Sequence, residues 1–179
     1  MRRALGRIAA IILCAMAAPA TSFAQCTAIG APASCGVPGS VSMTAGRVVR
    51  LQMSAGSTAL TAPTTSDFDA GFNSTTGPTL TVSSNSAWTL HIRASTAVWN
   101  ATNTSPGAPA RTNKPAADLL WSTAAGGSFA ALTTSDANLV SGGATASSPT
   151  TIYFQTLYNW SVDSPGNYNL SIVLTLTAP

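Results

Sequence analysis

The end of the sequence alternates between apolar and polar side chains. Every second position from 168 to 176 is large and apolar, and the positions between them hold mostly Asn, Ser and Thr; the apolar residues are Tyr168, Leu170, Ile172, Leu174 and Leu176. A period of two is that of a β-strand with one buried face, because a helix would distribute the same residues around its circumference. The sequence therefore predicts a core strand near the C-terminus.

Similar alternation recurs from Gly36 onward. Apolar residues alternate at positions 48–53, 80–82, 88–93 and 151–162, with shorter candidates at 119–122, 129–132 and 138–141. The short connection at 83–86 predicts a hairpin, and the Pro-Gly turn at 163–167 predicts that residues 151–162 pair with the last strand. Only residues 115–121 favour a helix, of one or two turns. The fold class expected is all-β, a single immunoglobulin-like β-sandwich of about seven to nine antiparallel strands.

The first 24 residues have the features of an export signal. Arg2, Arg3 and Arg7 precede a short apolar stretch, and Ser22-Phe23-Ala24 offers small residues for a signal peptidase. A membrane anchor is the rival reading, but about 11 apolar residues fall short of the ~20 that cross a bilayer. We therefore expect a cleaved signal peptide at 1–24, a single domain at 25–179 with no membrane span, and a secreted protein. The choice between periplasm, cell surface and extracellular space stays open.

Removal of this leader changes the charge of the chain. Three of the 8 Lys and Arg residues lie in the leader. The remaining five are balanced in charge by 5 acidic residues, all of them Asp. The exported chain is then formally neutral, so its composition gives no argument for a nucleic-acid partner.

Two cysteines remain after the leader is removed. Cys26 and Cys35 form an even pair in an oxidising compartment, which predicts a disulfide bond. A metal site is the poorer reading, because two thiols and the single histidine, His91, do not supply four ligands.

A six-residue turn before the last strand carries a resemblance. Asp163-Ser164-Pro165-Gly166-Asn167-Tyr168 resembles the D-x-G-x-Y turn of immunoglobulin-like domains, in which the tyrosine hydroxyl bonds back to the backbone. Tyr168 would be the corner residue and Gly166 keeps the spacing, while Asp163 stands one position earlier than the aspartate of the motif. Leu170 occupies the place of the second core cysteine of antibody domains, so the chain is not an antibody-type domain.

The overall layout resembles exported bacterial pilin-like and spore-coat-like β-sandwich proteins. A leader, an early disulfide, Ser/Thr-rich strands and a final apolar strand are the shared features. This resemblance implies surface assembly or adhesion, with no catalytic residues and no cofactor.

Catalytic and metal-binding chemistry find little support in the sequence. The chain has no Glu, and its only histidine, His91, alternates with Leu90 and Ile92 as an outward strand residue. Asp67, Asp69 and Asn73 offer spaced oxygen ligands around a glycine and are a weak candidate for calcium, against the reading of a solvated turn. We expect no enzyme activity.

Exposed aromatic rings would indicate a carbohydrate ligand. Trp88 and Trp160 are in phase with core residues, which predicts that both are buried. Trp99 lies beside an irregular segment and Tyr153 points to the opposite face of its strand, so these two are the candidates for contact with a ligand.

The function expected is therefore that of a non-enzymatic structural or adhesion protein of the cell surface. Its partners would be copies of itself or another surface protein, joined through sheet edges at the residues after Gly36 and at the terminal strand. The alternative is a carbohydrate-binding module that contacts polysaccharide through Trp99 and Tyr153.

Overall fold

The computed structural model describes residues 25–103 and 110–179, so the predicted signal peptide at 1–24 lies outside the described residues. The chain divides into two compact units, of which the second runs from Ala45 to Pro179. All strands belong to this second unit. The described residues before Ala45 form no strand, so the β-sheets all lie in this second unit, within the predicted domain of 25–179.

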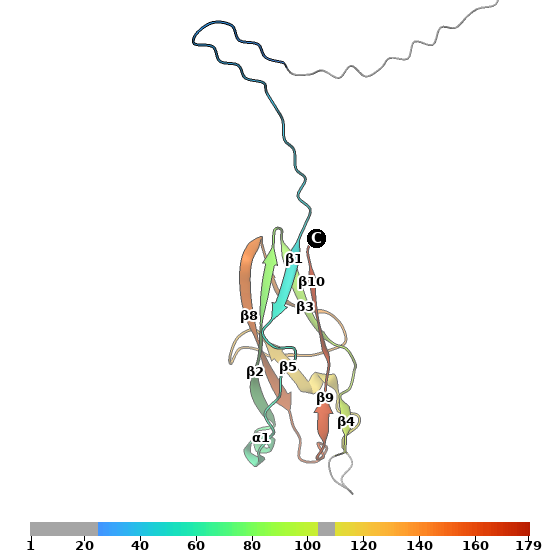
Figure 1. The fold of residues 1–179 in the computed structure, drawn as a ribbon. Helices are drawn as coiled ribbons and strands as arrows, with labels where there is room; N and C mark the ends of the chain where they lie inside the picture. The colour runs from blue at the N-terminus through green and yellow to red at the C-terminus, as the bar shows by residue number, and fades with distance from the viewer. Residues whose placement is uncertain (1–24, 104–109) are drawn as a thin grey trace, which may run out of the picture. The chain divides into compact units, whose positions relative to one another are not determined.

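The prediction of an all-β fold with antiparallel strands is confirmed. Ten strands form two main sheets and a short ribbon (Figure 1). The first sheet has the order β1 (Val49–Met53), β2 (Phe72–Ser84), β8 (Thr145–Leu157), β5 (Leu119–Ser122) and β6 (Ala130–Ala131). The second sheet has the order β10 (Ile172–Thr177), β3 (Trp88–Ala94) and β7 (Ala137–Gly142), and the ribbon pairs β4 (Asn100–Thr102) with β9 (Asn167–Asn169).

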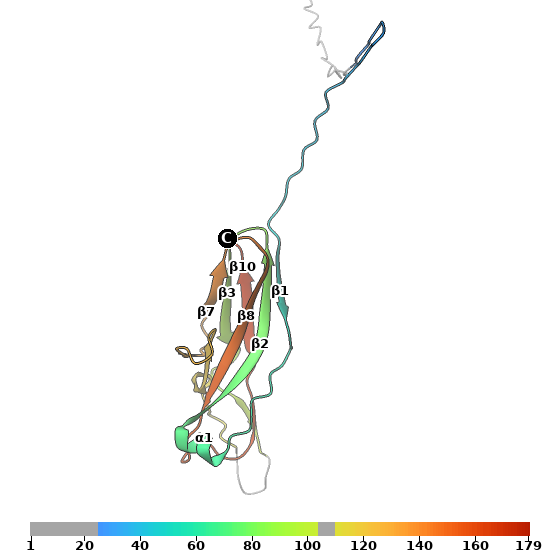
Figure 2. The same cartoon turned by 90° about the vertical axis from the view of Figure 1, so that its left-hand side faces the viewer.

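The core lies between the two sheets, which Figure 2 shows as two layers. Strand β3 alternates strictly between buried and half-buried residues, as its sequence predicts, and Leu90 and Ile92 are fully buried. Leu80 of β2 and Ile152 of β8 cover them from the first sheet. Apolar alternation in both sheets thus produces one shared core.

Two helices are short. The turn η1 (Ala116–Asp118) lies in the segment where the sequence predicts one or two helical turns. Helix α1 (Thr65–Ala70) was not predicted, although Thr64 and Asp67 form a capping box at its start and Gly71 ends it at φ 81°. The described part of the chain contains no helix with the length and apolarity of a membrane span.

Both predicted hairpins are wrong. Strand β2 lies in the first sheet and β3 in the second, and β8 pairs with β2 and β5 instead of with β10. The residues between β2 and β3 carry the chain across the sandwich: the side chain of Ser84 bonds to Ser86, and that of Asn85 bonds to Val48 and Gly46. Two consecutive strands show the same apolar alternation whether they pair side by side in one sheet or face each other across the core. The alternation therefore cannot distinguish a hairpin from a crossing between sheets.

Candidate functional site

Two of the edge strands, β1 and β10, lie near each other on one side of the sandwich, with some Cα atoms within 8 Å, but do not pair. Strand β1 pairs only with β2, and β10 pairs only with β3, so each has a free edge among the described strands. In an edge strand, alternate residues direct their N–H and C=O groups away from the sheet. These groups can accept a further strand.

The apolar side chains of β10 are incompletely covered. Leu174 pairs with Ile92, and Leu176 pairs with Leu90. The two residues on β3 are fully buried, whereas their partners on β10 remain partly exposed. Strand β10 therefore carries core residues without a complete cover on its outer side.

A groove opens beside this edge. It has a volume of about 840 Å³ and is walled by Leu51 and Met53 of β1 and by Leu170, Ile172 and Leu174 on the side of β10. Core side chains such as Phe154 reach its base. The groove lies at the β1 and β10 side of the sandwich and combines these apolar side chains with polar residues such as Thr58, Asn169 and Ser171.

The first unit contains a short apolar alternation of its own, residues 37–43, which we call the N-terminal segment. Val37, Val41 and Met43 occupy odd positions and are 50%, 101% and 89% exposed; Pro38, Gly39 and Ser40 separate the first two, and Ser42 separates the last two. An alternation of this kind is the pattern of a strand with one buried face, although the segment forms no strand in this chain.

The turn before the last strand is held by Tyr168, as its motif predicts. The Tyr168 hydroxyl donates a hydrogen bond of 2.6 Å to the Ser164 carbonyl and accepts one of 3.0 Å from the Arg111 amide. The chain packs closely against Gly166, where a Cβ atom would lie 2.5 Å from that of Ala110. This corner fixes the chain at the entrance to β9.

Asp163 belongs to a buried ion-pair cluster. Its Oδ1 accepts hydrogen bonds from Lys114 at 2.9 Å and Arg111 at 3.0 Å, and both cations also contact Asp118 at 3.2 Å. Burial by itself would raise the pKa of Asp163, but the bonds from Lys114, Arg111 and the Asn159 amide hold it below its usual value. Asp163 thus ties the turn to the segment around η1, a role that its position in the sequence did not reveal.

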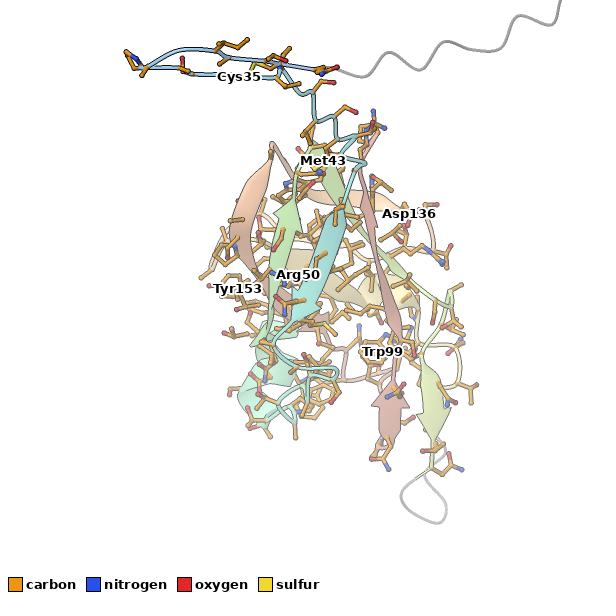
Figure 3. All side chains as sticks on the ribbon, turned by 45° about the horizontal axis from the view of Figure 1, so that its top comes forward. Cys35, Met43, Arg50, Trp99, Asp136 and Tyr153 are labelled. Carbon is orange, nitrogen blue, oxygen red and sulfur yellow. A yellow bond between two sulfur atoms is a disulfide. The ribbon has the colours of Figure 1, made fainter. Side chains whose placement is uncertain are left out.

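The predicted disulfide between Cys26 and Cys35 is present in the first unit. Of the two predicted ligand-contacting rings, Trp99 is only 5% exposed, so the expectation of an exposed ring there is wrong (Figure 3). Its indole N–H donates to the Pro115 carbonyl, and the ring lies within the core cluster. Tyr153 is half-buried in β8.

The candidate calcium ligands lie at helix α1. The Asp67 carboxylate accepts bonds from the Thr64 amide and hydroxyl, both 2.7 Å long, and these bonds lower its pKa. Asp69 accepts a bond from the Trp160 indole, and Asn73 lies in β2. Among the described residues no three acidic, histidine or cysteine side chains gather as metal ligands do.

The prediction that Trp160 is buried is wrong, because its side chain is 59% exposed. Strand β8 ends at Leu157, and residues 159–163 form a turn in which the Val162 and Asp163 amides donate to the Asn159 carbonyl. The alternation therefore stops before Trp160. Trp88, by contrast, is 3% exposed, as predicted.

His91 lies on the outward face of β3 and is half-buried. Its Nδ1 atom has no hydrogen-bond partner in the described structure. No acid or nucleophile with the geometry of a catalytic triad contacts it among the described residues.

No family model matches the sequence, and no curated protein shows significant similarity to it.

Proposed function

We propose that the protein is a secreted, non-enzymatic structural or adhesion protein of the cell surface that assembles with copies of itself. In this assembly the N-terminal segment of one copy adds as a strand beside β10 of another. The observation that carries the proposal is the complementarity between a partly uncovered core strand and an exposed segment with the pattern of a missing strand.

The dimensions of the two partners agree. Residues 37–43 and strand β10, extended at about 3.3 Å per residue, each span roughly 20 Å. The free backbone groups of β10 would pair with those of the added segment. Small residues between the apolar ones, such as Gly39 and Ser40, leave room for close approach of two backbones.

The apolar contacts favour the same arrangement. On assembly, three exposed side chains would leave water and pack into the groove lined by Leu51, Met53 and the β10 side chains; they are those of Val37, Val41 and Met43. Burial of each such side chain contributes about 1.5–3 kcal/mol before the cost of ordering the segment. The pilin-like and spore-coat-like layout of the sequence also implies surface assembly.

Light scattering of the purified protein over a concentration series, under non-reducing conditions, tests the proposal. The parent protein is expected to grow into oligomers as its concentration rises. The double variant V41D/M43D should remain monomeric, because both substitutions place a charge against the apolar side chains of the groove.

The double variant S40D/S42D is the matched control, since it adds the same charge at neighbouring positions of the opposite face. It should assemble like the parent. A parent protein that is monomeric at every concentration, or equal assembly of the two double variants, would exclude this mode of assembly.

A labelled peptide of residues 36–48 gives a second readout. It should bind the monomeric V41D/M43D protein, whose own groove is unchanged, and a peptide with Asp at both positions should not. Fluorescence anisotropy measures both.

A further inference from the structure

Three aromatic side chains gather at the end of β8, beside helix α1. The ring of Phe68, on α1, lies 4.6 Å from the ring of Trp160 and 5.3 Å from that of Tyr158, measured between centroids. Phe68 and Tyr158 are partly buried, whereas Trp160 is 59% exposed. The cluster therefore presents Trp160 to solvent on a packed aromatic base.

The orientation of Trp160 is fixed. One face of its indole packs against Phe68 at an interplanar angle of 31°, and its N–H donates a 3.0 Å hydrogen bond to Asp69 Oδ1. An exposed tryptophan held at its edge and along one face loses little conformational entropy when a ligand stacks on it. Scattered exposed apolar residues need no explanation, but a ring held in this way is prepared for binding.

The surroundings of Trp160 combine a cavity with polar side chains. A cavity of about 770 Å³ is lined by Phe68, Tyr158 and Trp160, and also by the polar residues Thr61 and Asn167. This size is within the range of small-ligand sites. Asp69 is exposed beside the indole edge, and only its Oδ1 atom accepts a bond from the protein.

The charges disfavour an acidic ligand. Lys114 is the only cation among the residues that line the cavity, and Asp163, Asp118 and the Leu157 carbonyl already accept its three hydrogen bonds. No free cation in the described part of the chain is thus available at this cavity to pair with a carboxylate or sulfate of a ligand. The exposed Asp69 would repel such groups.

We propose that this site binds neutral polysaccharide, with a sugar ring stacked on Trp160 and a ring hydroxyl donating to Asp69. A pyranose ring has an apolar face of C–H groups and a rim of hydroxyls, which matches a flat indole beside an acceptor. The ligand class is the one that the sequence suggested, but the residues are Trp160 and Asp69 in place of Trp99. The cavity and the groove share Leu60, Trp99 and Tyr168 in their walls, but Trp160 lines only the cavity, so substitution of Trp160 tests this site separately from the proposed assembly.

Affinity electrophoresis of the purified protein in gels that contain cellulose-derived glucan, soluble chitin derivative or mannan tests the proposal, with polygalacturonate as the acidic comparison. At least one neutral polysaccharide should retard the protein, and polygalacturonate should not. W160A should weaken the binding at least roughly tenfold, equivalent to about 1.4 kcal/mol. W160F, which keeps a smaller ring, should lie between the parent and W160A.

Y153A is the matched control: Tyr153 is the other ring that the sequence suggested for ligand contact, but it is half-buried in β8 and does not line this cavity, so the variant should bind like the parent if the site is at Trp160. D69N keeps an acceptor for the indole but removes the charge, and it should weaken binding less than W160A. Light scattering should give all these variants the size distribution of the parent, which separates a failure of this site from a failure of assembly.

Three results would overturn the proposal. The first is that no neutral polysaccharide retards the parent protein. The second is that the parent and both Trp160 variants are retarded equally. The third is that the parent prefers polygalacturonate. Binding of a proline-rich peptide at Trp160 without binding of saccharide would assign the site to another ligand class.

Discussion

The side chain of Lys114 is only 3% exposed, and its ammonium group donates three hydrogen bonds within the protein. It donates to Asp118 and Asp163 and to the Leu157 carbonyl, at distances of 2.8–3.2 Å. Buried charges require partners because their desolvation is costly. The cluster thus joins the end of β8, the turn before β9 and the η1 segment through one side chain.

Substitution of Lys114 by Met is therefore expected to destabilise the protein by about 3–5 kcal/mol, since it leaves the buried Asp163 with one cation fewer. Urea unfolding followed by tryptophan fluorescence measures the loss. R93M is the control, because Arg93 pairs with Asp136 at the surface, where ion pairs contribute about 1 kcal/mol or less. Equal losses in the two variants would contradict the role of the buried cluster.

The lowered pKa of Asp163 predicts a loss of stability in acid. Burial opposes the lowering, and the bonds from Lys114 and Arg111 outweigh it. Because the folded-state pKa lies below that of the unfolded chain, the stabilisation is complete above the unfolded value of about 3.9 and disappears as the pH falls through the folded value. The difference in unfolding free energy between the parent and D163N should therefore stay constant from pH 7 to about pH 5 and narrow as the pH falls below about 4. A difference that does not narrow in acid would contradict this linkage.

Strands β2 and β8 form the longest pairing of the fold, and a glycine allows their close contact. A Cβ atom on Gly77 would lie 2.5 Å from the ring of Phe154, which is 3% exposed. The register of the pair shifts just after this position, between Thr76 and Thr79. The ring occupies the space that a side chain at 77 would need.

G77A is accordingly expected to lower the unfolding free energy by about 1–3 kcal/mol, because the added Cβ would overlap the Phe154 ring and force it out of its packed position. Thermal unfolding by circular dichroism measures the change. G143A is the matched control: nothing lies within 4 Å of a Cβ atom there, so its stability should stay within about 0.5 kcal/mol of the parent. A G77A protein as stable as G143A would show that the ring can shift.

The elements differ in how far the sequence reveals them. Alternation identified the long strands and their inward faces, because side-chain period is a local property. It did not assign β2 and β3 to different sheets, since either arrangement buries the same residues. Helix α1 was mistaken for a solvated loop because its Asp67 has the spacing of a ligand as well as that of a capping residue. Trp160 was misplaced because strand β8 ends at Leu157, five residues before the apparent alternation ends at Val162.

At the scale of the whole molecule, the sequence alone predicted only part of the candidate sites. The two segments proposed for assembly, the residues after Gly36 and the terminal strand, follow from their patterns alone. The groove between β1 and β10 does not, because it depends on which strands remain at the edges of two sheets. The cavity beside Trp160 likewise joins α1 to a turn that is distant in the sequence.

The passage of the chain from one sheet to the other has a consequence for the order of folding. Neighbouring strands β2 and β3, and again β7 and β8, enter different sheets, so few pairings are between adjacent segments. Folding that depends on distant pairings is slow, because loops must close before contacts form. During synthesis, β3 has its neighbour β10 only after residues 172–177 have been made. Until then the edge of β3 that β10 will occupy has unpaired N–H and C=O groups, so this side of the second sheet is the last to close.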